Sequence, residues 1–226
     1  MVVTRNAITI AGAGPGSPDY ITPLVARAVH DADVLAGAPR LLGLFRESSA
    51  ERIVVGSDLE PALAAIAYAH AQNRRVTVLV TGDPGVASLA QPIMRRFGRD
   101  ECRLLPGVSS VQVAFARLGL SWDDAIILNA HRATPSVRPD AVLGPRTASR
   151  TIAVLLGCAQ AANWLEAMGR AVAAAASHRI IACRDLTLPH ESIAELPPEA
   201  LANLATSRQT ILLFVPNRSD DARNAV

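Results

Sequence analysis

The chain has 226 residues, of which 50% are hydrophobic and 19% charged, so it is long enough to bury a sizeable core. Its net charge of +2, from 22 basic and 20 acidic residues, is too balanced to indicate nucleic acid as a partner. Every basic residue is arginine, which agrees with a compositional bias and also suits carboxylate ligands.

Cysteine usage and hydropathy bear on the cellular compartment. Cys102, Cys158 and Cys183 form no Cys-x-x-Cys pair and no Cys/His cluster, so the sequence predicts neither a disulfide framework nor a metal site. Residues 1–12 contain too short an apolar run for a signal peptide, and no stretch approaches roughly 18 uninterrupted apolar residues. We therefore expect a cytoplasmic protein without a membrane or nucleic-acid partner.

The first half of the chain alternates short β-branched runs with longer segments rich in Ala and Leu. This alternation of strand and helix patterns predicts an α/β fold. Residues 59–74 are expected to form a helix whose first turn contains Glu60 and Pro61. The expected strands are residues 7–11, 34–37, 52–56, 76–80 and 102–106.

A second group of strand patterns follows Trp122. Residues 119–124, between the two groups, combine a glycine typical of a helix end with two acids before the next strand. We therefore expect two lobes, residues 1–120 and 121–226. Residues 133–146, with three prolines and two arginines, predict a mobile loop or an irregular helix over a site. The second group comprises strands at 125–129, 151–156, 179–183, 191–196 and 210–215 and a helix at 159–172.

The first strand runs into a glycine-rich loop. Gly12, Gly14 and Gly16 lack the spacing of a Rossmann fingerprint, and the next helix begins only after Thr22, its expected N-cap. The acid that would hold a ribose is misplaced as well, because Asp33 precedes the second strand instead of following it. A dinucleotide-binding oxidoreductase is therefore a disfavoured alternative, and this loop alone favours a turn without a ligand.

The strand at 76–80 leads into the residues TGDPG, in which an acid follows a glycine. A carboxylate at the carboxyl end of a parallel strand lies where open α/β sheets bind their ligands. Asp83 therefore either contacts a ligand, through ribose hydroxyls or an amino group, or caps a helix that begins near Ser88. The local pattern leaves both interpretations open.

The residues LLPGVSSVQVAFARLG repeat this arrangement after the strand at 102–106. A Pro-Gly turn leads to Ser109 and Ser110 at the start of a helix, where small hydroxyls either cap the helix or bind a ligand. Because the carboxyl ends of parallel strands share one edge of a sheet, the three loops together predict a ligand crevice.

In this order and at these separations, the segments GAGPGSPDYIT, TGDPGVASL and PGVSSVQVAFARLGL resemble the tetrapyrrole methylase family of S-adenosylmethionine-dependent enzymes, over essentially the whole chain. The resemblance implies two α/β lobes with the cofactor in the cleft between them, and a homodimer. It implies that Gly82 and Asp83 hold the cofactor, beside Val86, Ser109 and Ser110. Further implied cofactor contacts are Pro15, Leu156, Cys183, Gln209 and Thr210.

Within this family, the segment AIILNAHR most resembles the precorrin methylases that act on carbon 5 of the corrin precursor in cobalamin biosynthesis. His131 matches the histidine of their Ser-x-His-Gly-Arg signature, although Asn129 replaces the serine and Arg132 occupies the glycine position. The resemblance implies that His131 is a catalytic base or orients the substrate. A loop histidine without either role is the alternative.

A precorrin carries carboxylates on its rim, which arginine side chains bind through paired hydrogen bonds. Any metal would belong to this substrate. Because the chain ends at Val226, we expect a separate enzyme to methylate carbon 15 and remove a carboxyl group, as a second domain does in some relatives. Action at another ring carbon and a non-enzymatic tetrapyrrole carrier are further alternatives. Candidate substrate contacts are Asp19, Tyr20, Arg40, Arg132 and Arg138.

Overall fold

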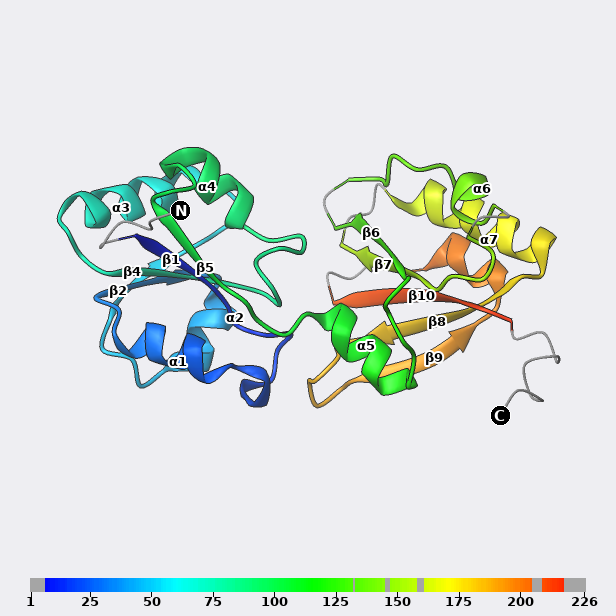
Figure 1. The fold of residues 1–226 in the computed structure, drawn as a ribbon, viewed down its shortest axis with the longest axis horizontal. Coiled ribbons are helices and arrows are strands. Elements are labelled where there is room, and N and C mark those ends of the chain that lie inside the picture. Colours follow the sequence, from blue (N-terminus) through cyan, green and yellow to red (C-terminus); the bar gives the residue numbers. More distant parts are fainter. Residues whose placement is uncertain (1–6, 132, 145–146, 158–160, 205–208, 218–226) are drawn as a thin grey trace. The chain divides into compact units, whose positions relative to one another are not determined.

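The computed structural model describes residues 7–131, 133–144, 147–157, 161–204 and 209–217. Within these residues the chain forms two five-stranded sheets, one in each of the units Met1–Ser110 and Val111–Val226 (Figure 1). The predicted α/β class is confirmed. Helix α5, Ser110–Leu118, belongs almost entirely to the second unit, whereas the predicted boundary at residues 120–121 places it in the first.

The first sheet is entirely parallel and has the strand order β3-β2-β4-β1-β5. Helical segments connect its successive strands, as parallel pairing requires. The strands are β1 (Ile8–Gly12), β2 (Val34–Gly37), β3 (Glu51–Val54), β4 (Val76–Val80) and β5 (Cys102–Leu105). The helical segments are η1 (Pro18–Tyr20), α1 (Pro23–His30), α2 (Pro39–Leu42), η2 (Gly43–Phe45), α3 (Glu60–Ala71) and α4 (Ala90–Phe97).

Helices cover both faces of this sheet (Figure 1). Along β1, Ile8 and Ile10 pack with residues of α3 and α4, while Ala11 joins residues of α1 and α2 on the opposite face. Because β1 leads to α1 on one face and its neighbour β4 leads to α4 on the other, the chain switches faces between two adjacent strands. Open α/β sheets bind their ligands outside the carboxyl ends of the strands at such a point.

The second sheet is mixed and has the strand order β6-β7-β10-β8-β9. Strands β6 and β7 are parallel, whereas β10 is antiparallel to both β7 and β8, and β9 is antiparallel to β8. The strands are β6 (Ile126–Ala130), β7 (Ile152–Leu156), β8 (His178–Arg184), β9 (Ser192–Leu196) and β10 (Thr210–Pro216). The helices are α5, α6 (Pro139–Val142), α7 (Ala162–Ala175) and η4 (Pro198–Asn203).

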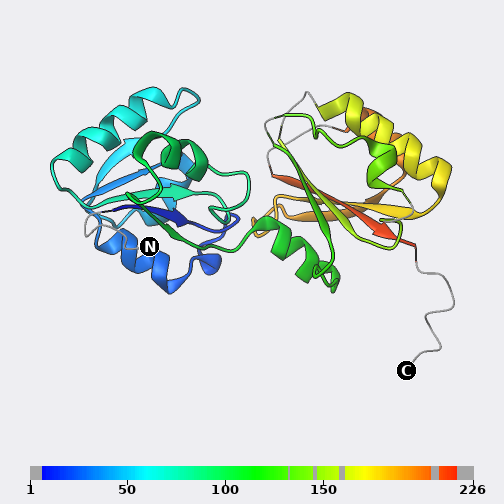
Figure 2. The same cartoon turned by 45° about the horizontal axis from the view of Figure 1, so that its top comes forward.

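Helix α7 lies along one face of the second sheet (Figure 2). Its residues Leu165 and Met168 are fully buried against the inner side chains of β7, β8 and β10. The segment that contains α6 packs against α7. Trp164 Nε1 donates to the Val137 carbonyl at 2.7 Å, and Val142 of α6 is buried in the same core. The described part of residues 133–146 is therefore packed on α7 and contains one short helix.

In the part of the chain that the structure describes, every helix is too short or too polar to cross a membrane. The N-cap predicted for the first long helix is confirmed, since Thr22 Oγ1 accepts a hydrogen bond from the Val25 amide at 3.3 Å.

Candidate functional site

The loops after β1 and β4 are joined by main-chain hydrogen bonds at the carboxyl edge of the first sheet. The Ala13 amide donates to the Val80 carbonyl at 2.8 Å, and the Gly82 amide donates to the Gly14 carbonyl at 2.8 Å. Gly14 and Gly82 both have positive φ angles, 76° and 64°, which L side chains rarely adopt. The pairing therefore depends on glycine at both positions.

The loop after β5 packs against the same two loops, backbone against backbone. A Cβ atom added to Gly107 would lie 2.3 Å from the Gly12 carbonyl oxygen and 2.4 Å from that of Gly82. A Cβ added to Gly12 would lie 2.7 Å from the Gly107 amide nitrogen. Because these positions lack a side chain, three strand ends can meet. We call Gly12, Gly82 and Gly107 the glycine junction.

Asp83 connects two of these loops through its carboxylate. Oδ1 accepts a hydrogen bond from the Gly85 amide at 2.7 Å, and Oδ2 accepts one from the Gly107 amide at 3.2 Å. Helix α4 begins at Ala90 with Leu89 in the N-cap position, so the alternative in which Asp83 caps this helix is wrong. Each carboxylate oxygen has two lone pairs, so Asp83 can brace the loops and still accept a hydrogen bond from a ligand.

The other cofactor candidates of the first unit belong to the three loops of this junction or directly follow them. Ser109 is 6% exposed, and its Cα lies 3.6 Å from the position of a Cβ added to Gly82. Pro15 is buried, Val86 is half-buried, and Ser110 is the first residue of α5. The structure therefore brings together three loops that lie far apart in the sequence, after β1, β4 and β5, because parallel strands end at one shared edge.

Arg40 lies at the same edge. It follows β2, and its Nη2 donates to Oγ1 of Thr81, the residue before Gly82. Burial of the guanidinium among protein atoms lowers the pKa of Arg40, although much of the side chain is exposed to solvent. No carboxylate of the described residues forms an ion pair with Arg40. Sequence reasoning missed Thr81, whose place at a strand end was its only signal.

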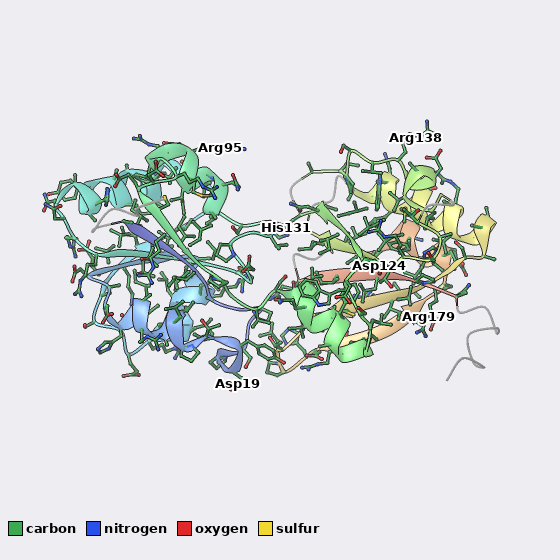
Figure 3. The ribbon with its side chains drawn as sticks, in the orientation of Figure 1. Asp19, Arg95, Asp124, His131, Arg138 and Arg179 are labelled. Atoms are coloured by element: carbon green, nitrogen blue, oxygen red, sulfur yellow. The ribbon has the colours of Figure 1, made fainter. Side chains whose placement is uncertain are left out.

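The remaining substrate candidates differ in their surroundings. Asp19 is exposed in η1 and accepts a hydrogen bond from Ser17 Oγ at 3.1 Å, while Tyr20 packs over Gly14. Arg138 is already paired with Asp140 at 2.6 Å on the surface. Figure 3 shows Arg138 on the α6 side of the second unit, away from His131. Arg132 lies outside the described residues.

Strand register gathers the candidates of the second unit at one edge of its sheet. Ala130 pairs with Leu156, so His131 lies beside the end of β7. Ile211 pairs with Leu155 on one side and with Cys183 on the other. The start of β10 therefore lies between the ends of β7 and β8, because β10 runs antiparallel to both. The gathered candidates are His131, Leu156, Cys183, Gln209 and Thr210.

His131 is half-buried, and two of its contacts lie within its own unit. Its amide donates to Asn129 Oδ1 at 2.9 Å, and its Nδ1 lies 3.3 Å from the Leu156 carbonyl oxygen. A carbonyl oxygen can only accept, so Nδ1 carries the proton in this contact. In the neutral ring the lone pair is then on Nε2, which is the arrangement of a proton acceptor.

Burial restricts what three of the gathered residues can offer a ligand. Cys183 is fully buried, and this burial, followed by the charge of Glu191, raises the pKa of its thiol to about 11. The thiol therefore stays protonated and is a poor nucleophile. The Leu156 side chain is 1% exposed in the core around α7, and Thr210 is also 1% exposed. Leu156 and Thr210 therefore present almost no surface in this structure.

The position of Asp33 bears on the alternative of a dinucleotide-binding oxidoreductase. Asp33 lies at the amino end of β2, the edge opposite the glycine junction, and its carboxylate accepts from the Arg75 amide at 2.8 Å and from Arg75 Nη2 at 2.7 Å. It is therefore not placed to hold a ribose at the crevice, which argues against a dinucleotide site. Among the described residues, no group of three or more His, Cys, Asp or Glu side chains is placed to hold a metal ion.

The family model described as Tetrapyrrole (Corrin/Porphyrin) Methylases matches residues 7–202. A curated relative, cobalt-precorrin-7 C(5)-methyltransferase of Salmonella typhimurium, is 32% identical over 124 residues, which cover 55% of this chain and 61% of that relative. The match thus spans about three fifths of the relative's length.

Two solved structures share the fold. Precorrin-6Y methylase of cobalamin biosynthesis from Archaeoglobus fulgidus has a TM-score of 0.69 and 24% identity, covering 94% of this chain and 100% of that one. Uroporphyrin-III C-methyl transferase from Thermus thermophilus, solved with S-adenosyl homocysteine, has a TM-score of 0.71 and 19% identity, covering 92% of each chain.

Proposed function

Because the chain belongs to the tetrapyrrole (corrin/porphyrin) methylase family, we propose that it is an S-adenosylmethionine-dependent methyltransferase that acts on carbon 5 of a precorrin in cobalamin biosynthesis. The observation that carries the ring position is the 32% identity with a relative named for that carbon. Fold likeness alone would not select a ring carbon, because one fold serves many substrates.

The glycine junction and Asp83 fit a cofactor of this kind. Three loops that meet at the switch point of a parallel sheet allow a ligand to approach the main chain closely. Gly82 and Asp83 would hold the cofactor there, with Pro15, Val86, Ser109 and Ser110 around them. In the second unit Leu156, Cys183, Gln209 and Thr210 are the proposed contacts. The sulfonium of S-adenosylmethionine supplies a methyl group that is already activated, so the protein's task is placement.

His131 is the proposed proton acceptor. Methylation of a ring carbon requires that a proton leaves the macrocycle, and an imidazole with its lone pair on Nε2 can take it. The Leu156 carbonyl and the Asn129 side chain orient the residue. If the ring instead positions a rim carboxylate, substitution of His131 should weaken substrate binding and leave the saturated rate largely unchanged.

Among the candidate arginines that the structure describes, Arg40 is the one proposed to bind a rim carboxylate of the substrate. Its guanidinium lies at the edge that carries the glycine junction, and its contact with Thr81 orients it without neutralising its charge. Asp19 and Tyr20 belong to the loop after β1 and are proposed to line the same substrate surface. Arg138 is a weaker candidate because Asp140 already occupies its guanidinium.

Assembly and partners follow from the same proposal. We propose a homodimer in the cytoplasm, and a separate enzyme that methylates carbon 15 and removes a carboxyl group. Light scattering at several concentrations tests the dimer, and a mass corresponding to one chain would contradict it.

Two measurements test the function. S-adenosylhomocysteine should raise the melting temperature, as a ligand selective for the native state does, whereas NAD should not. No shift at millimolar ligand would contradict the cofactor class. Incubation with a set of precorrins and methyl-labelled cofactor, with the product located by NMR, should show label at carbon 5. Label at another ring carbon would overturn the ring position and keep the enzyme class.

A further inference from the structure

Gly157, the residue after β7, lies directly against the imidazole of His131. A Cβ added to Gly157 would lie 2.3 Å from His131 Nδ1 and 2.7 Å from the His131 carbonyl oxygen. Both distances are far below van der Waals contact. The φ angle of Gly157 is outside the left-handed region, so its own backbone conformation would accept a side chain. What excludes a side chain at position 157 is the histidine.

Because Gly157 has no side chain, the imidazole of His131 can approach the Leu156 carbonyl. Leu156, which supplies that carbonyl, is the neighbour of Gly157 and pairs with Ala130, the neighbour of His131. Parallel pairing of β6 and β7 thus places the histidine and the glycine at matching positions beyond the two strand ends. A methyl group at position 157 would displace the ring from the Leu156 carbonyl.

The contact with Leu156 selects one of the two neutral forms of the ring. A neutral imidazole carries its proton on Nδ1 or on Nε2, and the hydrogen bond made by one nitrogen determines which. A carbonyl beside Nδ1 favours the proton there. Removing the contact would remove what this carbonyl contributes to the preference, even if the histidine remained in place.

We infer that Gly157 is a positioning residue: it admits the His131 ring to the Leu156 carbonyl, which keeps the proton on Nδ1 and the lone pair on Nε2. The catalytic consequence rests on the proposed function. In that reaction Nε2 takes the proton released by the methylated macrocycle, the electron pair of the broken C–H bond returns to the macrocycle, and the ring becomes an imidazolium that keeps its Nδ1 hydrogen bond.

The tautomer can be measured on the unmodified protein. Two-bond ¹H–¹⁵N correlation spectra of ¹⁵N-histidine-labelled chain, at a pH high enough to make the ring neutral, distinguish a protonated Nδ1 from a protonated Nε2. Signals that disappear in His131→Gln belong to His131. We expect the Nδ1-protonated form. A ring protonated mainly on Nε2 would overturn the inference, whatever reaction the protein catalyses.

Gly157→Ala and Gly144→Ala form a matched pair for the role of the glycine. Gly144 lies in the same unit, and a Cβ there would make ordinary contacts at 3.5 Å with two carbonyl oxygens. Gly157→Ala should lose the Nδ1 preference and lower the single-turnover methyl-transfer rate by about 10²-fold, because the acceptor nitrogen is misplaced. Gly144→Ala should keep both the tautomer and the rate.

A double variant separates positioning from a general loss of structure. If Gly157 acts through the ring, Gly157→Ala should add little to the rate lost in His131→Ala, because the two changes remove the same group. Equal tautomer and rate in Gly157→Ala and the unmodified protein would contradict the inference, as would full additivity in the double variant. Absence of methyl transfer by the unmodified protein on every precorrin would instead contradict the proposed function, and the tautomer would still decide the inference.

Discussion

The carboxyl edge of the first sheet differs from the edge of the second sheet that holds His131 in the kind of groups that form it. The first is made of main chain, with glycines packed against one another and an aspartate that bonds to amides. At the second, the side chain of His131 contacts the Leu156 carbonyl, and His131 is the proposed proton acceptor. In the first sheet the ends of parallel strands share one edge, whereas in the mixed second sheet the ends of β7 and β8 flank the start of the antiparallel strand β10.

This difference suggests that the two edges have different functions. A main-chain cradle can bind a constant ligand, because its donors and acceptors do not depend on side-chain identity. Side chains supply the acid–base chemistry and substrate contacts that vary among enzymes of one fold. Substitutions in the glycine junction and at Asp83 should therefore act mainly on stability and cofactor affinity, and substitution of His131 mainly on rate.

The strongest test of this difference in function is His131→Ala. It should lower the single-turnover methyl-transfer rate by roughly 10² to 10⁴-fold, because a general base is lost. The affinity for S-adenosylhomocysteine should hardly change. Rapid-quench kinetics and calorimetry measure the two quantities. A variant equal to the unmodified protein in rate and in precorrin binding would show that His131 is only a loop residue.

Gly107→Ala tests the glycine junction at the carboxyl edge of the first sheet. The added methyl group would collide with the carbonyl oxygens of Gly12 and Gly82, both main-chain atoms that cannot rotate away. We expect the free energy of unfolding to fall by about 3 kcal/mol, the upper part of the usual range for overpacking. At Gly43 no described atom lies within 4 Å of an added Cβ, so Gly43→Ala should change urea unfolding by less than about 0.5 kcal/mol. Equal effects would break the comparison.

Asp83→Ala should affect both binding and stability, since its carboxylate belongs to the main-chain edge. Loss of the acceptor for the Gly85 and Gly107 amides should cost about 1 to 3 kcal/mol of stability. The affinity for S-adenosylhomocysteine should be lost as well. Asp83→Asn keeps one acceptor oxygen and removes the charge, so its stability should lie between that of the unmodified protein and that of Asp83→Ala. Retained affinity in Asp83→Ala would mean that the residue only braces the loops.

Arg40→Ala should weaken binding of the tetrapyrrole by about 10-fold, which is the usual scale of one hydrogen bond to a charged group. Arg40→Lys should recover only part of the loss, because lysine lacks the planar fork. Arg138→Ala is the matched comparison, since its guanidinium is occupied by Asp140, and it should have little effect. A larger loss in Arg138→Ala would reverse the assignment. Steady-state KM values for a precorrin report these differences.

Asp33→Asn should have the smallest effect. Hydrogen bonds from Arg75 lower the pKa of Asp33 from 3.8 to about 2. A lowered folded-state pKa contributes stability above pH 3.8 that is lost as the pH falls toward 2. In the variant the free energy of unfolding should therefore depend less on pH in that window. The effect should shrink in high salt because the pair is exposed. Altered cofactor affinity would contradict the placement of Asp33 at the opposite edge.

Local patterns predicted much of the fold. The β-branched runs became the strands, Thr22 caps a helix as expected, and the three loops after β1, β4 and β5 do meet at one edge. These features follow from neighbours in the sequence: side-chain alternation, capping residues and turn residues. Their physical causes act over a few residues, so they are visible without a structure.

The contacts of the site were decided by tertiary structure. Nothing near Asp83 in the sequence indicates that Gly107, 24 positions away, would donate to its carboxylate. His131 likewise meets Leu156 and Gly157 only because β6 and β7 pair in one register. The sequence by itself determined which segments are strands, helices and loops. Only strand order and register, which depend on burying both faces of each sheet, decided which loops become neighbours and hence which hydrogen bonds orient the aspartate and the histidine.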